Sequence, residues 1–343
     1  MITKIRQALS EPVKHIKFAY FHTRTFLGKV FGSRDFVRQT WSGDRSIDGA
    51  KDVAIFVHFD KKGAVHDYVI EHLRAWGEAG FAVVFVTNCP KFEKRAIERV
   101  RPYVTKILHR HNRGYDFGSY RDAIVSLGDL SRIDRLVLCN DSVYGPFVPL
   151  QDVISKCDPE VADVWGLTDS WQGRYHLQSY FLLFHKTALE SEAFQKRWRH
   201  FVHIDDKDWV VSKHEISLTG EMLQSGLKVR SLWRYSDQID AFVRQLDGQP
   251  EWRGSGALSD HQKQTIESML GFAQGGVPMN INHFFWDRLL IEGYPFIKRD
   301  LVSANPMNLP NTFRWRHVIG GLSEYDTELI VNHLENTLRN RSI

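Results

Sequence analysis

The chain has 343 residues, of which 43% are hydrophobic and 25% charged, so it is long enough for one large α/β domain with additions and too apolar for a disordered chain. Its formal net charge of +4 is too small for the basic surface that nucleic-acid binding requires, so nucleic acid is not expected as a partner. Three cysteines without paired spacing predict buried free thiols in a reducing compartment.

The first 41 residues combine basic side chains with interspersed aliphatic and aromatic ones. A segment of this kind can lie on an anionic membrane surface, where each Lys or Arg contributes about 1 kcal/mol. A helical hairpin packed on the domain fits the same pattern, so both interpretations stay open. The sequence has no apolar run of membrane-spanning length and no secretory signal pattern. We expect residues 1–50 to form a basic, amphipathic helical segment of a cytoplasmic protein.

From Val53 onward, short apolar runs alternate with amphipathic segments, as in strands buried on both faces and the helices that cover them. The expected strands are Val53–Phe59, Phe81–Thr87, Val104–His109 and Arg135–Cys139. The expected helices between them are Val65–Trp76, Lys91–Arg101 and Ser119–Leu127. This alternation predicts a doubly wound, mostly parallel sheet with right-handed crossovers.

The second half of the chain is less regular. Further strands are expected at Asp163–Leu167, Ser179–His185 and Lys228–Trp233, and helices at Leu189–Phe201 and Glu215–Gly226. Between residues 237 and 263 the composition becomes polar and rich in glycine, which indicates an insertion or linker. We therefore expect a main domain over residues 51–305 and a helical tail over residues 306–343.

Polar side chains follow the first four expected strands, at the point where each strand ends. They are His58 and Asp60, Thr87 and Asn88, the run His111–Gly118, and the run Asn140–Ser142. Ligands of open parallel sheets bind beyond the carboxyl ends of the strands, so these residues are candidates for a binding site. Asp, Asn and Gly are also common in turns, so each position taken alone is better explained by loop chemistry, whereas the four strand ends together favour a site.

The motifs of several other nucleotide-binding and catalytic sites are missing from the sequence. The loop after the first strand, Asp60–Gly63, lacks the G-x-G-x-x-G fingerprint, and no P-loop, paired zinc spacing or G-x-S-x-G elbow occurs. What remains is a nucleotide-type sheet with a carboxylate on the loop after a central strand. That placement suits Mg²⁺ or Mn²⁺, because these ions take oxygen ligands and share them with phosphates.

Five ordered segments carry a family resemblance. They are Phe56–Asp60 (FVHFD), His111–Ile124 (HNRGYDFGSYRDAI), Leu136–Phe147 (LVLCNDSVYGPF), His214–Val229 (HEISLTGEMLQSGLKV) and Asn282–Val302 (NHFFWDRLLIEGYPFIKRDLV). In them the chain resembles the rhamnan synthesis F family, glycosyltransferases of bacterial surface-polysaccharide and lipopolysaccharide assembly. The resemblance covers residues 53–305 and implies a GT-A-like (Rossmann-like) fold that transfers a sugar, with rhamnose favoured, from a nucleotide-sugar donor.

The resemblance also implies roles for individual residues. The expected donor-binding residues are His58, Asp60, Asn88, Asn112, Gly114, Asp116, Arg121 and Asn140. His58 and Asp60 are expected near the donor base or ribose. The loop that contains Asn112, Gly114 and Asp116 is expected along the nucleotide. Arg121 lies one turn into the following helix, where it either reaches a phosphate or faces solvent.

Asn140–Ser142 stands where GT-A enzymes carry the metal-binding Asp-x-Asp pair, and only Asp141 is a carboxylate here. The resemblance implies that Asp141 and His283 hold Mg²⁺ or Mn²⁺ beside the donor diphosphate. One carboxylate binds a divalent cation more weakly than two, so this departure predicts weaker metal dependence. For His283 a second interpretation stays open, a histidine hydrogen-bonded inside an aromatic-rich core.

An inverting transfer needs a carboxylate that takes the proton of the acceptor hydroxyl, a contribution of roughly 10²–10⁴ in rate. The resemblance implies that this acid lies at the start of a helix under the sugar. Glu215 is the candidate base, because His214 and Glu215 open an expected helix. A capping box is the competing explanation, with Ser212 as the N-cap and Glu215 bonded back to it.

These observations predict a glycosyltransferase that transfers a sugar to a glycan or lipid-linked acceptor, in the cytoplasm or at the inner face of the membrane. The alternative is a catalytically inactive glycan- or nucleotide-sugar-binding relative of the same fold, and the reduced Asp-x-Asp motif favours it. A nicotinamide-dependent sugar-modifying enzyme shares the sheet type but lacks support from a glycine fingerprint.

Overall fold

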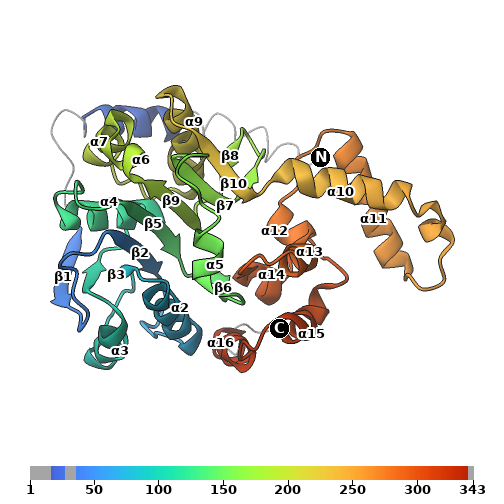
Figure 1. The fold of residues 1–343 in the computed structure, drawn as a ribbon, viewed down its shortest axis with the longest axis horizontal. Helices are drawn as coiled ribbons and strands as arrows, with labels where there is room; N and C mark the ends of the chain where they lie inside the picture. The colour runs from blue at the N-terminus through green and yellow to red at the C-terminus, as the bar shows by residue number, and fades with distance from the viewer. Residues whose placement is uncertain (1–16, 28–35, 339–343) are drawn as a thin grey trace.

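The computed structural model describes residues 17–27 and 36–338, and its centre is a sheet with helices on both faces (Figure 1). The strands of this sheet are β1 (Val37–Ser42), β2 (Asp52–His58), β3 (Ala82–Thr87), β4 (Lys106–Arg110), β5 (Arg135–Asn140), β7 (Val164–Ser170), β8 (His176–Leu177), β9 (Phe181–His185) and β10 (Val229–Trp233). Their order is β1-β4-β3-β2-β5-β9-β7-β10, and β8 pairs with β7. Strands β3, β4, β5, β7 and β10 run parallel to β2, whereas β1, β8 and β9 are antiparallel to their neighbours. The expected α/β class with a mostly parallel sheet is confirmed.

The chain enters the parallel part of the sheet in its middle. It starts at β2, moves outward through β3 to β4, and returns to β5 on the other side of β2. The connections that leave β2 and β5 therefore diverge at the carboxyl ends of these two strands. In open α/β sheets this switch point is where ligands bind.

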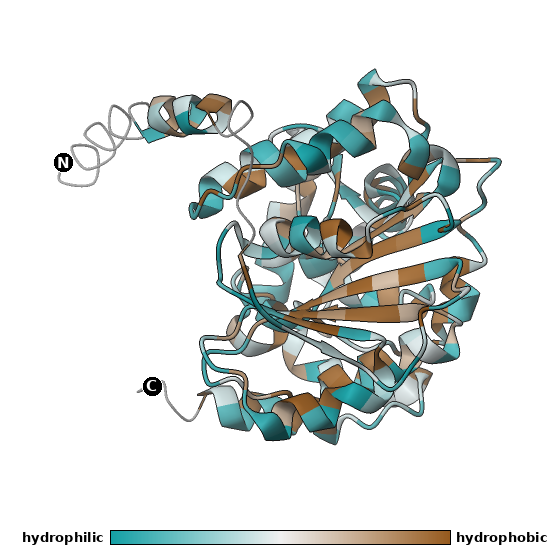
Figure 2. Cartoon of the chain, turned by 90° about the vertical axis from the view of Figure 1, so that its left-hand side faces the viewer, coloured by the Kyte–Doolittle hydropathy of each residue, from teal (hydrophilic) through white to brown (hydrophobic). Residues whose placement is uncertain are grey.

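Two apolar layers sandwich the sheet, because successive side chains of a strand point to opposite faces. On β2, Phe56 packs with one layer and Ile55 with the other. The first layer includes α2 (Asp67–Glu78), α3 (Lys94–Val100) and α5 (Leu150–Ile154). The second includes α4 (Tyr115–Leu127), α6 (Lys186–Glu190), α7 (Glu192–Arg199) and α9 (Ile216–Gln224). Figure 2 shows the apolar strands between these helices. All three cysteines are buried and free, as predicted.

A buried ion pair fixes α4 against the sheet. The guanidinium of Arg110, at the end of β4, lies 2.9 Å from the carboxylate of Asp122 on α4, and neither side chain is exposed. Arg110 also donates to the backbone carbonyl of Arg113 at 2.8 Å, in the loop that leads into the helix. His203 approaches the other oxygen of Asp122 at 3.2 Å. The network therefore sets the position of the first turn of α4.

The predicted polar insertion is a helical hairpin. Helices α10 (Tyr235–Asp247) and α11 (Asp260–Gln274) extend away from the sheet (Figure 1). Polar residues dominate both helices, but Phe242 and Met269 are buried in a small apolar cluster between them and the helices that follow. This periodic burial, which the overall composition hides, is why the segment is helical and not a linker.

The remaining helices return the chain to the first apolar layer. They are α12 (Ile281–Phe284), α13 (Trp286–Ile291), α14 (Arg299–Ala304), α15 (Trp315–Leu322) and α16 (Glu328–Leu338). A short ribbon, β6 (Val143–Tyr144) paired antiparallel with β11 (Ile297–Lys298), joins them to the end of β5. The predicted helical tail is thus well packed: Ile330 of α16 is fully buried, and His333 Nδ1 lies 2.7 Å from Tyr144 Oη.

The predicted N-terminal helical segment is only partly helical. Residues 17–27 form a helix in which Phe18 and Phe21 pack against Trp209, at 5.4 Å between ring centroids in both cases. Val37–Ser42, in contrast, form β1 and pair with β4, so the helical expectation for residues 1–50 is wrong there. Residues 1–16 and 28–35 lie outside the described residues. Within the described ranges, each helix is too short or too polar to span a bilayer.

Replacing Asp122 with Leu should destabilise the protein by about 3–5 kcal/mol, because the Arg110 guanidinium would stay buried without the carboxylate that balances it. Urea denaturation measures the loss. The control is Asp237→Asn, which breaks an exposed ion pair with Arg234 and should change stability by about 0–1 kcal/mol. Equal effects of the two substitutions would show that the buried pair does not hold α4.

Candidate functional site

Asp141 lies across the ends of the two strands at the switch point. Its backbone N–H donates to the carbonyl of Val57 at 3.0 Å, and its Oδ2 accepts from the backbone N–H of Phe59 at 3.3 Å. The parallel register places Val57 opposite Asn140, so the loops after β2 and β5 meet here. The structure thereby confirms that the polar strand ends come together at one edge of the sheet.

Arg299 binds the same residue from the far end of the chain. Its Nη1 lies 3.0 Å from Asp141 Oδ2 and donates to the Asp141 carbonyl at 2.6 Å. The β6–β11 ribbon explains this approach, because it pairs Lys298 with Val143, just after Asp141. Burial opposes the charge of Arg299, but the adjacent carboxylate of Asp141 raises its pKa above the ordinary value.

Asp116 stands in the first turn of α4 and faces the same edge. Asn140 Nδ2 donates to Asp116 Oδ2 at 2.9 Å, and this bond links the loop after β5 to the helix. Burial, together with the negative charges of Asp141 and Glu215, raises the pKa of Asp116 to about 7. Asp141 and Glu215 are therefore close enough to Asp116 for their charges to disfavour its ionisation.

Gly114 caps α4 with a left-handed backbone, φ +74°, that favours glycine. A Cβ at this position would meet Gly118 Cα and His203 Cδ2 at 3.3 Å each. The backbone N–H of Gly114 donates to Asp205 Oδ1 at 2.8 Å. The backbone conformation and the tight packing of this loop against α4 thus explain a glycine at position 114, whether or not a nucleotide lies along the loop. Asn112, in the same loop, is exposed.

Glu215 lies inside a continuous helical segment, not at a helix start. That segment begins with α8 (Lys207–Val210), whose N-cap is Asp206, and continues through a π turn (Val211–Glu215) into α9. The expectation that Glu215 opens a helix is therefore wrong, and so is the capping box with Ser212. A π turn widens the helix locally and is frequent at functional sites.

The carboxylate of Glu215 is held from one side. Its Oε1 accepts hydrogen bonds from the backbone N–H of Ser179 at 3.1 Å and from its hydroxyl at 2.8 Å. Within the described part of the chain, Oε2 accepts no hydrogen bond. Glu215 is half-buried, so its second oxygen is available to another group.

Lys298 is the second basic residue at this edge. Its Nζ lies 3.7 Å from the centroid of the Tyr180 ring, and the side chain is half-buried. Burial lowers the pKa of Lys298 to about 8, against the opposing charges of Asp300, Glu215 and Asp116. No hydrogen bond or ion pair joins Nζ to another residue among those the structure describes. The ammonium thus faces the carboxylates without a direct partner.

Asp60 shapes the loop after β2. Its Oδ1 accepts from the backbone N–H groups of Lys62 at 2.7 Å and Ala64 at 3.0 Å, as in an Asx turn. Burial opposes the ionisation of Asp60, but the hydrogen bonds from His66 and from these N–H groups hold its pKa well below the usual range. The loop chemistry foreseen for this position is therefore present, and contact with a donor ribose stays a prediction.

Three other predicted donor-binding residues point into the protein interior. His58 is only 1% exposed. Asn88 Oδ1 accepts from Arg110 Nη1 at 2.9 Å, within the network that holds α4. Arg121 donates to Asp122 at 2.9 Å and does not lie on a solvated helix face. Each has a structural partner of its own, and their contact with a donor stays a prediction.

The predicted metal ligands fit a divalent cation poorly. Oδ2 of Asp141 is already matched by the Arg299 guanidinium, which would repel a second cation at that oxygen. His283 is buried with its Nε2 3.2 Å from Asp300, while its Nδ1 has no partner among the described residues. Within that same part of the chain, no three His, Cys, Asp or Glu side chains group as a metal site.

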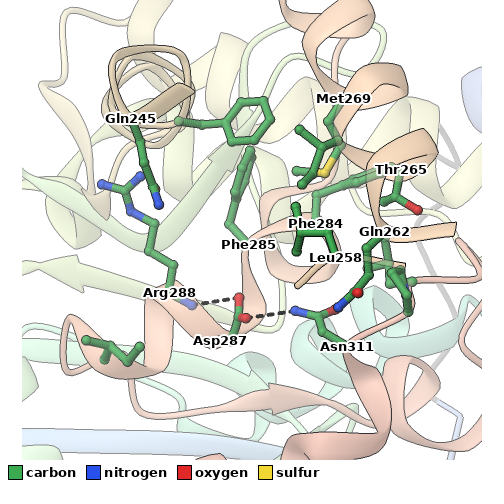
Figure 3. A pocket seen from close by; sticks show the side chains of 15 residues that line it. Gln245, Leu258, Gln262, Thr265, Met269, Phe284, Phe285, Asp287, Arg288 and Asn311 are labelled. Carbon is green, nitrogen blue, oxygen red and sulfur yellow. Dashed lines mark hydrogen bonds between the residues drawn. The ribbon is translucent and has the colours of Figure 1, made fainter. Parts of the chain in front are cut away.

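A separate cavity of about 430 Å³ lies between the α10–α11 hairpin and helices α12 and α13 (Figure 3). Its wall is mostly apolar and includes Phe242, Met269 and Phe284. Asp287 is its carboxylate, and it accepts hydrogen bonds from Asn311 Nδ2 at 2.7 Å and from the next backbone N–H at 2.9 Å. The cavity shares none of its lining residues with the strand ends.

Sequence reasoning missed Ser179, Lys298 and Arg299. The last two stand inside the C-terminal segment that carries the family resemblance, directly after the apolar run Tyr294–Ile297. Two adjacent basic residues at the end of a strand-like run were the available signal. Ser179 carried none, because its role depends on contact with a helix 36 residues further along the chain.

Residues 83–246 match the model of the family described as rhamnan synthesis protein F, which confirms the resemblance over that segment. The virulence protein VirA of Vibrio anguillarum (strain ATCC 68554 / 775) is 29% identical over 239 residues, which cover 66% of this chain and 73% of VirA. The uncharacterized protein y4gN of Sinorhizobium fredii (strain NBRC 101917 / NGR234) is 31% identical over 212 residues, which cover 59% of this chain and 54% of that protein.

Among solved structures, the glycosyltransferase GlyE of Streptococcus pneumoniae TIGR4 aligns at 12% identity with a TM-score of 0.37. The alignment covers 84% of this chain and 64% of GlyE, so the chain spans less than two thirds of that protein. The family match supports a glycosyltransferase-like protein of polysaccharide synthesis. The segment it covers contains Asp116, Asp141 and Glu215.

The raised pKa of Asp116 predicts a distinct pH dependence of stability. Because this pKa is about 7 in the folded protein and ordinarily 3.8, the folded state binds more protons than the unfolded chain between these values. Its stability therefore falls as the pH rises through this window, with a limiting slope of about 1.4 kcal/mol per pH unit.

Asp116→Asn removes this titration. Urea denaturation of both proteins at pH 4 to 8 should show the wild type losing stability relative to the variant as the pH rises toward about 7. A stability difference that does not change with pH would contradict the close approach of the three carboxylates.

Proposed function

We propose that this chain is a glycosyltransferase that transfers a sugar from a nucleotide-sugar donor to a glycan or lipid-linked acceptor in bacterial polysaccharide or lipopolysaccharide synthesis. The observation that carries the proposal is the meeting of Asp116, Asp141 and Glu215 with Lys298 and Arg299 at the switch point of the sheet. Carboxylates serve proton transfer there, and cations serve phosphates. The family match supports the reaction class, and its description favours rhamnose as the sugar.

Glu215 is the proposed base of an inverting transfer. Ser179 holds Oε1, so Oε2 is free to accept the proton of an acceptor hydroxyl. The hydroxyl oxygen then attacks the anomeric carbon of the donor, a C–O bond forms, and the bond to the diphosphate oxygen breaks. The electron pair leaves with the nucleoside diphosphate, and the proton stays on Glu215.

The donor nucleotide is proposed to lie over the ends of β2 and β5, with Asp60 and Asn140 beside it. The predicted Mg²⁺ or Mn²⁺ has no role in this mechanism, because Asp141 already contacts Arg299. Peripheral contact with the inner face of the membrane also belongs to the proposal. It is supported by the outward-facing Tyr20, Phe26 and Leu27 of the N-terminal helix.

A binding protein without turnover is the second candidate. The observation in its favour is the single carboxylate at the Asp-x-Asp position, whose charge is balanced by Arg299. The position of Glu215, with one oxygen held and one free, favours the enzyme.

Glu215→Gln should reduce transfer by about 10²–10⁴-fold, because glutamine keeps an oxygen for Ser179 but cannot take a proton. The melting temperature and donor affinity should stay close to the wild-type values. Sugar transfer to a glycan acceptor gives the first readout, and thermal denaturation and calorimetry give the others. The matched control is Glu221→Gln, which alters an acidic residue of α9 that pairs with Arg197. Full activity of Glu215→Gln would exclude Glu215 as the base.

A panel of dTDP-, GDP- and UDP-sugars identifies the donor class. A ligand at 100 times its Kd stabilises the folded state by about 2.7 kcal/mol, which thermal denaturation detects readily. We expect dTDP-rhamnose to stabilise the protein, and Asp60→Ala to weaken the effect. Stabilisation by a different nucleotide sugar would show that the donor carries that sugar and not rhamnose. Stabilisation without product in the transfer assay would favour the binding protein.

A further inference from the structure

We propose that Lys298 and Arg299 form a cationic site that binds the diphosphate of the donor and takes the place of a protein-held divalent cation. This inference rests on the proposed function and specifies how the donor is recognised. The family resemblance pointed to His283 in this segment of the chain, and neither basic residue was among the sequence candidates.

The β6–β11 ribbon fixes both residues at the strand ends. Lys298 pairs with Val143, and the backbone N–H of Arg299 donates to the carbonyl of Ser142 at 3.0 Å. These contacts fix the backbone of both residues relative to the loop after β5. This loop contains Asn140 and Asp141, which lie at the switch point where ligands of such sheets bind.

Arg299 is oriented but not saturated by its contacts. Both contacts to Asp141 use Nη1, and the guanidinium also lies over the Tyr68 ring at 5.5 Å and hydrogen-bonds Tyr144. A guanidinium carries five N–H donors in a planar fork, so these contacts do not use all of them. A quarter of the side chain is exposed. Arginine binds phosphates through paired N–H groups, so the remaining donors suit a diphosphate.

Lys298 supplies a second positive charge at the same strand ends. Its Nζ rests over the Tyr180 ring, and within the described part of the chain no carboxylate forms an ion pair with it. Lysine binds phosphate as a compact charge with three donors. An ammonium held by a ring face and facing the site can turn to a phosphate oxygen without breaking an ion pair.

The carboxylates and the basic side chains at the site balance each other before a donor binds. Asp300 contacts His283, and burial raises the pKa of Asp116 to about 7, so only part of its negative charge is present at neutral pH. This leaves Glu215 and Asp141 opposite Lys298 and Arg299. When Glu215 takes the acceptor proton, its negative charge disappears while negative charge grows on the leaving diphosphate. Lys298 then no longer faces the charge of Glu215, and together with the remaining donors of Arg299 it can stabilise the leaving group.

Calorimetry with dTDP, GDP and UDP, each in EDTA and in Mn²⁺, tests the site on the full chain. We expect the tightest-binding diphosphate to keep its Kd within about threefold when EDTA replaces Mn²⁺. Lys298→Met should weaken that binding about 10- to 100-fold, as expected for the loss of one charge-assisted hydrogen bond, and Lys298→Arg should restore most of it. Lys94→Met, at an exposed lysine on α3, is the matched control and should bind as the wild type.

Thermal denaturation establishes that each variant is folded. Binding that requires Mn²⁺ and disappears in EDTA would overturn the inference and leave the glycosyltransferase proposal standing. If Lys298→Met bound the diphosphate in EDTA as tightly as the wild type, this result would also overturn the inference and leave the glycosyltransferase proposal standing. Absence of binding by all three diphosphates in both conditions would overturn the inference together with the proposed function.

Discussion

The contact between Arg299 and Asp141 joins residues 158 positions apart and closes the switch point of the sheet. Without Arg299, the carboxylate of Asp141 would rest on a single backbone N–H from the end of β2. With it, the C-terminal ribbon is held against the two strands that define the site. Because a partly buried charge is costly without a partner, the pair also limits which other ions can lie at that oxygen. The position of Lys298 at this edge depends on the same ribbon.

The π turn has a comparable effect on the opposite side of the site. An α-helix from Lys207 to Gln224 would be expected to repeat its side-chain directions every 3.6 residues. The wider turn at Val211–Glu215 shifts that repeat just before Glu215, and the carboxylate meets the N–H and hydroxyl of Ser179. The hydrogen bonds fix one oxygen of a group that must exchange protons at the other. The π turn thus directs the Glu215 carboxylate toward Ser179.

The fold could be predicted from the sequence where the pattern is local. Continuous apolar runs such as Val53–Val57 mark strands buried on both faces, and β2 and β3 begin and end within a residue or so of the expected positions. Helical periodicity in α10 and α11 is masked by polar residues, because a hairpin that projects from the domain buries only a narrow stripe. β1 was hidden for a different reason: an edge strand pairs through its backbone, and its basic and aromatic side chains resemble those of an amphipathic helix.

The sequence predicted the site residues at the strand ends but not those of the C-terminal ribbon. Asn140, Asp141 and Asp116 follow strands or open a helix, so topology brings them together. Lys298 and Arg299 follow a strand-like run, but their position at the site depends on the pairing of two very short strands, which the sequence does not indicate.

The bond between Tyr144 and His333 has a consequence for the order in which the protein assembles on the ribosome. Among the described residues, the strands of the central sheet are synthesised before the ribbon partner β11, and helix α16, which carries His333, is synthesised after β11. Since domains begin to fold from the N-terminal side during synthesis, the sheet can form while the basic residues are still inside the ribosome. The nascent chain would then expose its strand ends with the carboxylates in place but with no cations beside them. These strand ends would gain Lys298 and Arg299 only after β11 has left the ribosome and paired with β6.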